Sequence, residues 1–282
     1  WGGRLMQSIL NKDLPPGKMI GESWELADHR DDITTPLNGP LAGASFHELY
    51  LKHSRELLGR MNGHGEAFPL LTKFIDSSQL LSLQVHPSDS FALEHDGEYG
   101  KTECWYVIES RDGMIYKGVL PGVSAEQFRR AIETDAVEKL VKRYDVRTGD
   151  FHYLPAGTVH ALGAGVVIAE VQTPSDTTYR VTDWGRGREI HVERSMQCIH
   201  FAPADDNAPG AGGETLLRTE FFNVAHRKAA GGGAVALPAG RCTALMMLRA
   251  DGPATVRHAG PAEPAVPARA GDTVLLPACL QD

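Results

Sequence analysis

The chain lacks the features of several large protein classes. Its four cysteines are scattered and form no C-x2-C pair, so they indicate neither a disulfide framework nor a cysteine zinc site. No hydrophobic run approaches the roughly 18 residues that span a bilayer, and no secretory signal pattern opens the chain. These absences predict a cytoplasmic protein with reduced thiols and no membrane partner. Because the chain begins at Trp1 without a methionine, we expect a few native residues before it.

An excess of positive charge is also missing. The chain has 28 Lys and Arg against 36 Asp and Glu, a formal net charge of −8, which argues against a nucleic-acid partner because such proteins normally show a basic face. Neither G-x-x-x-x-G-K-[ST] nor G-x-G-x-x-G occurs, which argues against nucleotide binding. An anionic small molecule is still allowed, since a local cluster of Lys and Arg binds phosphate even in an acidic protein.

Short stretches of alternating apolar residues dominate the chain. They are bounded by Gly, Pro, Asn and Asp and predict an all-β fold of strands about 5–8 residues long. Two segments, 45–60 and 124–143, instead carry apolar residues at helical spacing, and Ser124 is a plausible helix cap. We therefore expect a few helices packed on a β core.

A change in composition divides the chain into two units. Residues 201–213 are rich in Ala, Gly, Pro and Asp, which is typical of a linker, so we predict domains over 1–200 and 214–282. GDFHYLPAG at 149–157 is echoed by GDTVLLPAC at 271–279, but no histidine follows the second copy. We expect the second unit to be catalytically empty and, since it is short of a closing strand, to continue beyond Asp282.

Two strand motifs carry the candidate chemistry. Gly149, Pro155, Gly157 and His160 fit G-x5-P-x-G-x2-H, which resembles the second cupin motif, where the glycines and the proline turn the chain so that the histidine points inward. The first cupin motif usually supplies H-x-H and a glutamate soon after. Here the strand offers Gln84 and His86, which share a face because side chains two apart on a strand point the same way, and the glutamate is delayed to Glu103.

That departure is typical of one family. The segments LSLQVHPSD, GKTECWYVI, PAGTVHALG and VQTPSDTTYRVTDWGR together resemble type I mannose-6-phosphate isomerases in the short form that lacks a large helical domain. The likeness runs from WGG at the start, through GESWELAD, to the second unit. It implies two cupin jelly-roll barrels, the second degenerate, with the helices packed on the first. It also implies an isomerase that interconverts mannose 6-phosphate and fructose 6-phosphate through a cis-enediol, acting as a monomer or homodimer.

The resemblance assigns roles to individual residues. It implies one Zn²⁺ per chain, held by Gln84, His86, Glu103 and His160, a donor set that suits zinc or a similar ion.

Four further residues are candidates for contact with the sugar phosphate. Arg180 matches the family's catalytic arginine. Lys101 shares the face of Glu103 if the segment is extended. Glu170 matches a carboxylate that faces the same cavity, although a structural acceptor explains it nearly as well. Ser82 matches a phosphate contact, although a plain strand serine is the simpler interpretation.

The identity of the general base stays open at this point. Glu170, Lys101 or a metal-ordered water could carry the proton, and we expect a neighbouring cation and the metal to lower the pKa of Lys101. His95 and His152 have no ligand partner at a sensible spacing, and Trp105 is expected in the core.

Three other functions compete with this assignment. A metal-dependent cupin isomerase of a different sugar phosphate fits the motifs almost equally well. A cupin dioxygenase is disfavoured because only two histidines occupy ligand positions. A non-catalytic sugar-binding cupin is disfavoured because all four ligands are present.

Overall fold

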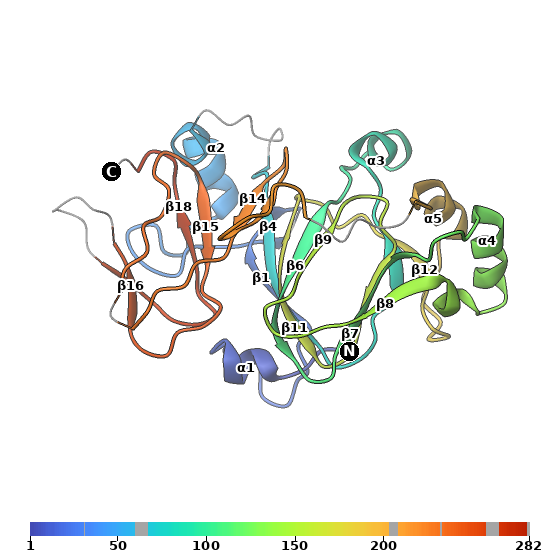
Figure 1. Cartoon of the computed structure of the whole chain (residues 1–282). Coiled ribbons are helices and arrows are strands. Elements are labelled where there is room, and N and C mark those ends of the chain that lie inside the picture. Colours follow the sequence, from blue (N-terminus) through green and yellow to red (C-terminus); the bar gives the residue numbers. More distant parts are fainter. Residues whose placement is uncertain (31, 60–66, 203–207, 232, 258–264, 281–282) are drawn as a thin grey trace.

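The protein is mostly β-sheet, with a few helices on its outside (Figure 1). The structure, a computed structural model, describes residues 1–30, 32–59, 67–202, 208–231, 233–257 and 265–280. Its helices are α1 (Leu5–Ile9), α2 (Phe46–Leu58), α3 (Asp89–His95), α4 (Ala125–Glu133) and α5 (Val192–Cys198), with a 3-10 turn η1 (Val137–Leu140).

Two five-stranded antiparallel sheets form the larger unit. The first sheet has the order β1 (Glu22–Leu26), β4 (Leu71–Ser77), β11 (Val166–Gln172), β6 (Glu103–Ser110) and β9 (Phe151–Leu154). The second has the order β12 (Tyr179–Thr182), β5 (Leu83–Val85), β10 (His160–Leu162), β7 (Met114–Val119) and β8 (Val141–Asp145). A short hairpin of β2 (Asp28–His29) and β3 (Asp32–Ile33) follows β1.

The two sheets face each other across a shared core. Trp105 and Ile168 of the first sheet pack with Ile115 and Leu162 of the second, and all four are buried. Alternation along each strand explains this arrangement, because every second side chain of a strand points to the same face. The layer between the sheets that these four side chains form is therefore apolar. A polar group buried beside it needs hydrogen-bond or charge partners.

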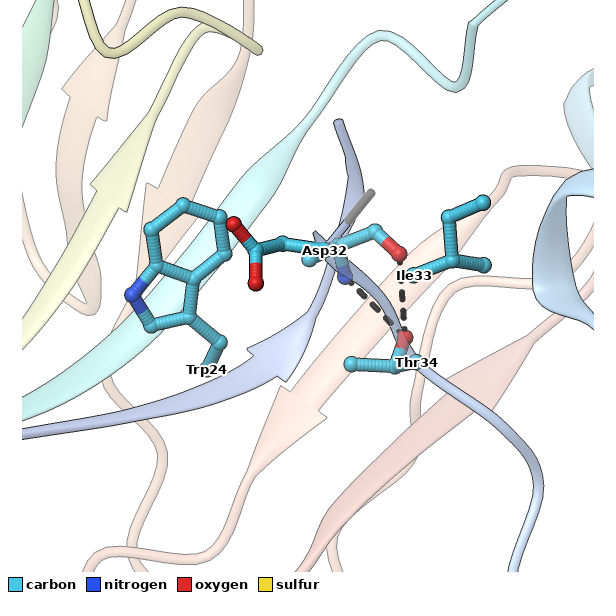
Figure 2. Close-up of a pocket in the computed structure, with 5 residues that line it drawn as sticks. Trp24, Asp32, Ile33 and Thr34 are labelled. Atoms are coloured by element: carbon cyan, nitrogen blue, oxygen red, sulfur yellow. Dashed lines mark hydrogen bonds between the residues drawn. The ribbon is translucent and has the colours of Figure 1, made fainter. Parts of the chain in front are cut away.

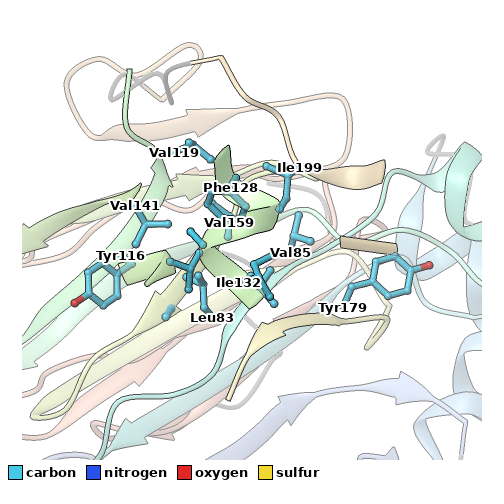
Figure 3. Close-up of a cluster of buried hydrophobic side chains, with 14 of the residues drawn as sticks. Leu83, Val85, Tyr116, Val119, Phe128, Ile132, Val141, Val159, Tyr179 and Ile199 are labelled. Atoms are coloured by element: carbon cyan, nitrogen blue, oxygen red, sulfur yellow. The ribbon is translucent and has the colours of Figure 1, made fainter. Parts of the chain in front are cut away.

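The outer face of the second sheet is covered by helices. Phe128 and Ile132 of α4, one helical turn apart, pack on Leu83 and Val85 of β5 (Figure 3). A capping box at Ser124 begins α4: its hydroxyl accepts from the Gln127 backbone N–H, and the Gln127 side chain accepts from the Ser124 N–H. This packing fixes the strands that carry the site described below.

The prediction of one helix over 124–143 is wrong. Helix α4 ends at Glu133, and Asp135 takes a positive φ of 54°, which an α-helix does not accommodate. Strand β8 begins at Val141, which pairs with Val119 of β7. Sheet pairing thus overrides the helical spacing of the last residues. The segment expected to be helical at 45–60 contains α2.

The C-terminal unit consists of three two-stranded antiparallel ladders. They pair β13 (Thr215–Arg218) with β14 (Asn223–Ala225), β15 (Thr243–Met246) with β18 (Thr273–Leu276), and β16 (Ala254–Val256) with β17 (Val266–Ala268). This unit contacts α2, whose Leu57 carbonyl accepts from the Ala278 N–H at 2.9 Å. Part of the predicted linker, 203–207, lies outside the described residues, and the domain boundary stays a prediction.

Both copies of the sequence repeat adopt the same turn. Asp150 accepts from the Arg147 N–H at 2.8 Å, and Asp272 accepts from the Arg269 N–H at 2.9 Å. The preceding glycines have φ angles of 98° and 91°, which only glycine adopts readily. A strand follows in each case, β9 in the first unit and β18 in the second. The repeat is therefore present in the structure as well as in the sequence.

Candidate metal centre

Three predicted ligands meet between the two sheets. Nitrogen atoms of His86 and His160 and a carboxylate oxygen of Glu103 all lie within 4.8 Å of one another. His160 Nε2 is 3.1 Å from Glu103 Oε1, and His86 Nε2 is 3.8 Å from Glu103 Oε2. The three side chains are at most 2% exposed. This is the only such group of His, Cys, Asp and Glu within the described part of the chain.

Sheet register explains the convergence. His160 of β10 pairs directly with Gln84 of β5, and directly opposed residues of an antiparallel pair point to the same face. His86 follows Gln84 by two residues. Glu103 begins β6 in the opposite sheet, where it pairs with Gln172 of β11. Two strands of one sheet and one strand of the other thus aim their side chains at a common point.

The backbone orients both imidazoles in the same way. His86 Nδ1 donates to the Thr177 carbonyl at 2.9 Å, and His160 Nδ1 donates to the Thr158 carbonyl at 2.8 Å. A ring nitrogen fixed on a carbonyl leaves the other nitrogen, Nε2, free of its proton as a metal ligand. His86 Nε2 is buried and has no hydrogen-bond partner among the described residues. Such an orphaned acceptor is what a site for a cation requires.

Gln84 is the fourth predicted ligand. Its side-chain nitrogen Nε2 lies 3.4 Å from His160 Nε2. Rotating the terminal amide of Gln84 by 180° exchanges its oxygen and its nitrogen. After this flip, the amide oxygen faces the centre. The structure therefore places the amide beside His160, and the role of Gln84 as a ligand stays a prediction.

Lys101 is the counter-charge of the centre. Its Nζ is 2.6 Å from Glu103 Oε2 and 3.6 Å from Glu170 Oε1, and the side chain is buried. Burial alone lowers the pKa of Lys101, but the two carboxylates outweigh it and raise the pKa above the usual value. The lowering expected from the sequence depends on a bound metal and stays a prediction. Lys101 is held here as an ammonium ion.

The same charges shift the neighbouring groups. Burial raises the pKa of the Glu103 carboxyl, but the Lys101 ammonium and the two neighbouring histidines together outweigh burial and hold that pKa well below its usual range. Burial, followed by the charge of Lys101, lowers the pKa of His86 well below its usual value. His86 is therefore neutral and Glu103 ionised, which are the protonation states that a metal ligand needs.

Glu170 lies on the next strand and faces the same side. Its Oε2 accepts from Trp105 Nε1 at 2.8 Å, and the side chain is 3% exposed. Burial and the nearby Glu103 carboxylate raise the pKa of Glu170. Trp105, predicted to belong to the core, also packs edge-on against His160 with ring centres 5.4 Å apart. It therefore links the metal ligands to the second carboxylate.

Sequence reasoning missed a second buried lysine. Lys73 of β4 pairs directly with Glu170 of β11. Its Nζ is 3.3 Å from Glu22 Oε2 and 4.2 Å from the ring centre of Trp24. A lysine within the apolar strand LLTKFI was the available signal, because a buried strand rarely tolerates a charge without a function or a partner. Glu22 and Trp24 belong to GESWEL, which was noted without a role.

A small cavity of about 190 Å³ adjoins Trp24 and is separate from the metal ligands. Its lining includes Asp32, whose side chain extends toward the indole, and Thr34, whose hydroxyl bonds the Ala27 backbone (Figure 2). Of its lining residues, Trp24 contacts Lys73.

Arg180 lies on β12, the strand next to β5. It pairs directly with Gln84, so its side chain lies on the same face as the ligands. Its Nη1 donates to the Glu189 carbonyl at 2.6 Å, while Nε is buried without a partner among the described residues. Burial and the charge of Arg188 lower the pKa of Arg180. Ser82 is buried two residues before Gln84, and its phosphate contact stays a prediction.

Residues beyond the ligands fix the loop that carries Thr177. The neighbouring Asp176 lies 3.3 Å from His29 Nε2 and 3.6 Å from Arg30 Nη1. The contact with His29, and then Arg30, lowers the pKa of Asp176 to about 2. These contacts hold the carbonyl that orients His86.

The described helices include none with the length and apolar composition that crossing a membrane requires.

Comparisons with known proteins show which family the chain resembles. Residues 1–106 match the model of the phosphomannose isomerase type I catalytic domain. A mannose-6-phosphate isomerase of Streptococcus mutans is 39% identical over 236 residues, which are 79% of this chain and 73% of that protein. The isomerase ManA of Bacillus subtilis is 41% identical over 207 residues, which are 71% of this chain and 64% of that protein.

Solved structures show the same likeness. The crystal structure of the mannose 6-phosphate isomerase from Bacillus subtilis superposes with a TM-score of 0.82 at 29% identity. The match covers 99% of this chain and 90% of that one.

Proposed function

Because the chain belongs to the type I phosphomannose isomerase family, we propose that it is a metal-dependent aldose–ketose isomerase acting on mannose 6-phosphate and fructose 6-phosphate. The convergence of His86, Glu103 and His160, all three buried, carries the metal part of this proposal. Two imidazoles, a carboxylate and the amide of Gln84 suit Zn²⁺, one per chain. When bound, the ion supplies positive charge to oxygens of the reacting carbon atoms.

Glu170 is the best-supported carrier of the proton. The isomerisation moves a proton between C1 and C2 of the sugar through a cis-enediol, so one group must remove it beside a carbonyl and return it to the neighbouring carbon. Glu170 is a buried carboxylate whose pKa is raised toward the range of a useful base. Lys101 Nζ lies 2.6 Å from Glu103 and 3.6 Å from Glu170, and these contacts suit it to donate hydrogen bonds.

Arg180 supplies the second fixed positive charge. Its guanidinium lies on the ligand face, and its Nε is unpartnered within the described structure. A preorganised donor of this kind stabilises negative charge that develops on an enediolate oxygen, and its removal typically costs about 10²–10³ in rate. We assign Ser82 to the phosphate end of the substrate.

We further propose that both units are cupin jelly rolls and that the second has lost its metal site. The shared turn at Asp150 and Asp272 supports the common architecture. The four cysteines are free thiols, which supports a cytoplasmic location, and the protein is expected to act as a monomer or homodimer.

A coupled assay with purified protein tests the function. Mannose 6-phosphate is supplied, and fructose 6-phosphate is detected with and without prior removal of metal by a chelator. We expect activity in the loaded protein, loss on chelation and recovery with Zn²⁺. In ²H₂O, conversion should also incorporate deuterium at the carbon that receives the shuttled proton, because a solvent-exchanging base carries it.

Two results would contradict the proposal. Full activity in protein shown by elemental analysis to be metal-free would remove the ion from the mechanism. Turnover of another sugar phosphate with a kcat/KM far above that of mannose 6-phosphate would reassign the substrate while leaving the isomerase chemistry intact.

A further inference from the structure

The segment that follows Arg180 folds back on it. Strand β12 ends at Thr182, and residues 183–191, which we call the strap, run outward and return before α5 begins at Val192 (Figure 1). The outward turn uses positive φ angles at Trp184, Gly185 and Gly187 of 54°, 75° and 87°. Because β12 is the last strand of its sheet, the strap covers an edge that would otherwise be open.

A single buried carboxylate closes the strap. Asp183 is 3% exposed. Its Oδ1 accepts from Arg188 Nη2 at 2.5 Å, from Arg188 Nε at 3.0 Å and from Arg186 Nη2 at 3.0 Å, and its Oδ2 accepts from the Arg188 backbone at 3.2 Å. The first residue of the strap is thus joined to two arginines in its middle by charge-assisted bonds, which are the stronger class of hydrogen bond.

The returning end of the strap holds Arg180 at three points. The Arg180 N–H donates to His191 Nδ1 at 3.0 Å, and the Arg180 carbonyl accepts from the His191 N–H at 2.7 Å. The third bond joins Arg180 Nη1 to the Glu189 carbonyl at 2.6 Å. Backbone and guanidinium of one residue are therefore fixed by two residues of one loop.

We propose that the strap positions the Arg180 guanidinium for the reaction and that His191 is the positioning residue that fixes its backbone. This inference rests on the proposed function. An arginine side chain has large rotamer entropy, and a donor stabilises a developing charge only when it is already in place. On an uncovered edge strand, Arg180 would have its sheet bonds to β5 on one side only. The strap supplies bonds on the other side.

The chemistry of His191 makes this inference specific. Its Nδ1 accepts the Arg180 backbone N–H, so the bond needs an acceptor at this one ring position. The side-chain oxygen of asparagine can occupy the position of Nδ1, whereas glutamine reaches the position of Nε2. His191→Asn should therefore keep the bond to Arg180, while His191→Ala and His191→Gln should lose it.

Kinetics of the metal-loaded enzyme with mannose 6-phosphate tests the inference. We expect His191→Ala and His191→Gln to lower kcat about 10–100-fold with little change in KM, since a small misplacement of a catalytic group costs on this scale. His191→Asn should stay within about threefold of the wild type. Bound metal, measured by elemental analysis, should be unchanged in all three, because His191 touches no metal ligand in the described contacts.

A double-mutant comparison separates positioning from general structural damage. In an Arg180→Ala background, His191→Ala should cause little further loss of kcat, because the group that it positions is gone. Glu193→Gln is the matched control. Glu193 lies on α5, the helix that follows the strap, and its variant breaks the ion pair with Arg129 of α4. This change should leave kcat unchanged.

The outcomes distinguish this inference from the proposed function. If Arg180→Ala loses activity but His191→Ala does not, the strap proposal is overturned alone. An equal fold-loss of kcat from His191→Ala in the wild type and in Arg180→Ala also overturns it, because the effect would then not act through Arg180. If Arg180→Ala retains wild-type kcat, the catalytic assignment of Arg180 in the proposed function fails as well.

Discussion

Nζ of Lys101 lies 2.6 Å from Oε2 of Glu103, and both side chains are buried. In metal-free protein this ammonium is the main charge that balances the Glu103 carboxylate. Breaking a buried ion pair by removing one partner typically costs about 3–5 kcal/mol. We expect Lys101→Met to lower the free energy of unfolding of the metal-free protein on that scale, and to lower it less when a divalent ion balances Glu103. Urea unfolding with and without Zn²⁺ measures both values.

Lys12→Met provides the control for this prediction. Lys12 pairs with Glu25 at 2.6 Å, away from the metal ligands, so its cost should not depend on the ion. If Lys101→Met loses the same stability with and without metal, the Lys101 ammonium and the divalent ion do not both balance Glu103.

Metal-free protein should lose stability as the pH falls from about 6.5 to 5. The pKa of His86 is lowered well below its usual value by burial and by Lys101, so the native state leaves His86 neutral while the unfolded chain binds a proton there below about pH 6.5. The unfolded state then holds more protons, and the free energy of unfolding falls by up to about 1.4 kcal/mol per pH unit for one such group. Denaturant unfolding across this range measures the slope.

His86→Gln tests whether this group is responsible. The variant lacks the titrating ring, so its slope between pH 5 and 6.5 should be smaller by that amount. Glu103, whose pKa is also lowered, contributes to the loss only at lower pH, near the unfolded value of about 4.3. An unchanged slope in His86→Gln would assign the acid sensitivity to other groups.

The hydrogen bond from Trp105 to Glu170 predicts a shift in the pH–rate profile. Trp105 Nε1 donates to Glu170 Oε2 at 2.8 Å, which favours the ionised carboxylate. Trp105→Phe removes the donor while keeping an aromatic ring beside His160, so the pKa of Glu170 should rise further. If Glu170 is the base, the acid limb of kcat against pH moves to higher pH.

Tyr106→Phe is the matched control, because Tyr106 is the next residue of the same strand and its hydroxyl contacts His226 instead. Its acid limb should coincide with that of the wild type. An acid limb that does not move in Trp105→Phe would exclude Glu170 as the group that titrates in turnover.

The parts of the site that the sequence predicted are those set by short-range spacing. Gln84 and His86 share a strand face, and the Gly–Pro–Gly turn delivers His160 from the next motif, so neighbours in the chain define them. The position of Lys73 instead depends on pairing between β4 and β11, which spacing within one segment does not show. The strap, residues 183–191, was not predicted because a loop has no repeating pattern of apolar residues. The helix predicted to run to 143 ended early because Val141 pairs with β7, a long-range contact.

The glycines that open the two repeats should differ in how they tolerate a side chain. Gly149 and Gly271 have similar positive φ angles, 98° and 91°, so alanine at either position is strained by about 1–2 kcal/mol. A Cβ on Gly149 would meet nothing nearer than the Tyr106 hydroxyl at 4.0 Å, whereas a Cβ on Gly271 would lie 1.7 Å from the Leu10 carbonyl oxygen. Gly271→Ala must therefore also displace backbone.

This difference isolates the contact between the C-terminal unit and the N-terminal segment. Ala270, the residue before Gly271, accepts a hydrogen bond from the Asn11 side chain at 3.0 Å. Displacing the backbone at Gly271 therefore also strains a hydrogen bond between the two units. We expect Gly271→Ala to lower the free energy of unfolding by about 1–3 kcal/mol more than Gly149→Ala, the usual cost of forcing atoms into packed structure. Equal losses in urea unfolding would mean that the two units separate there at little cost. Since the candidate ligands His86, Glu103 and His160 all lie in the larger unit, kcat of the folded variant should match the wild type.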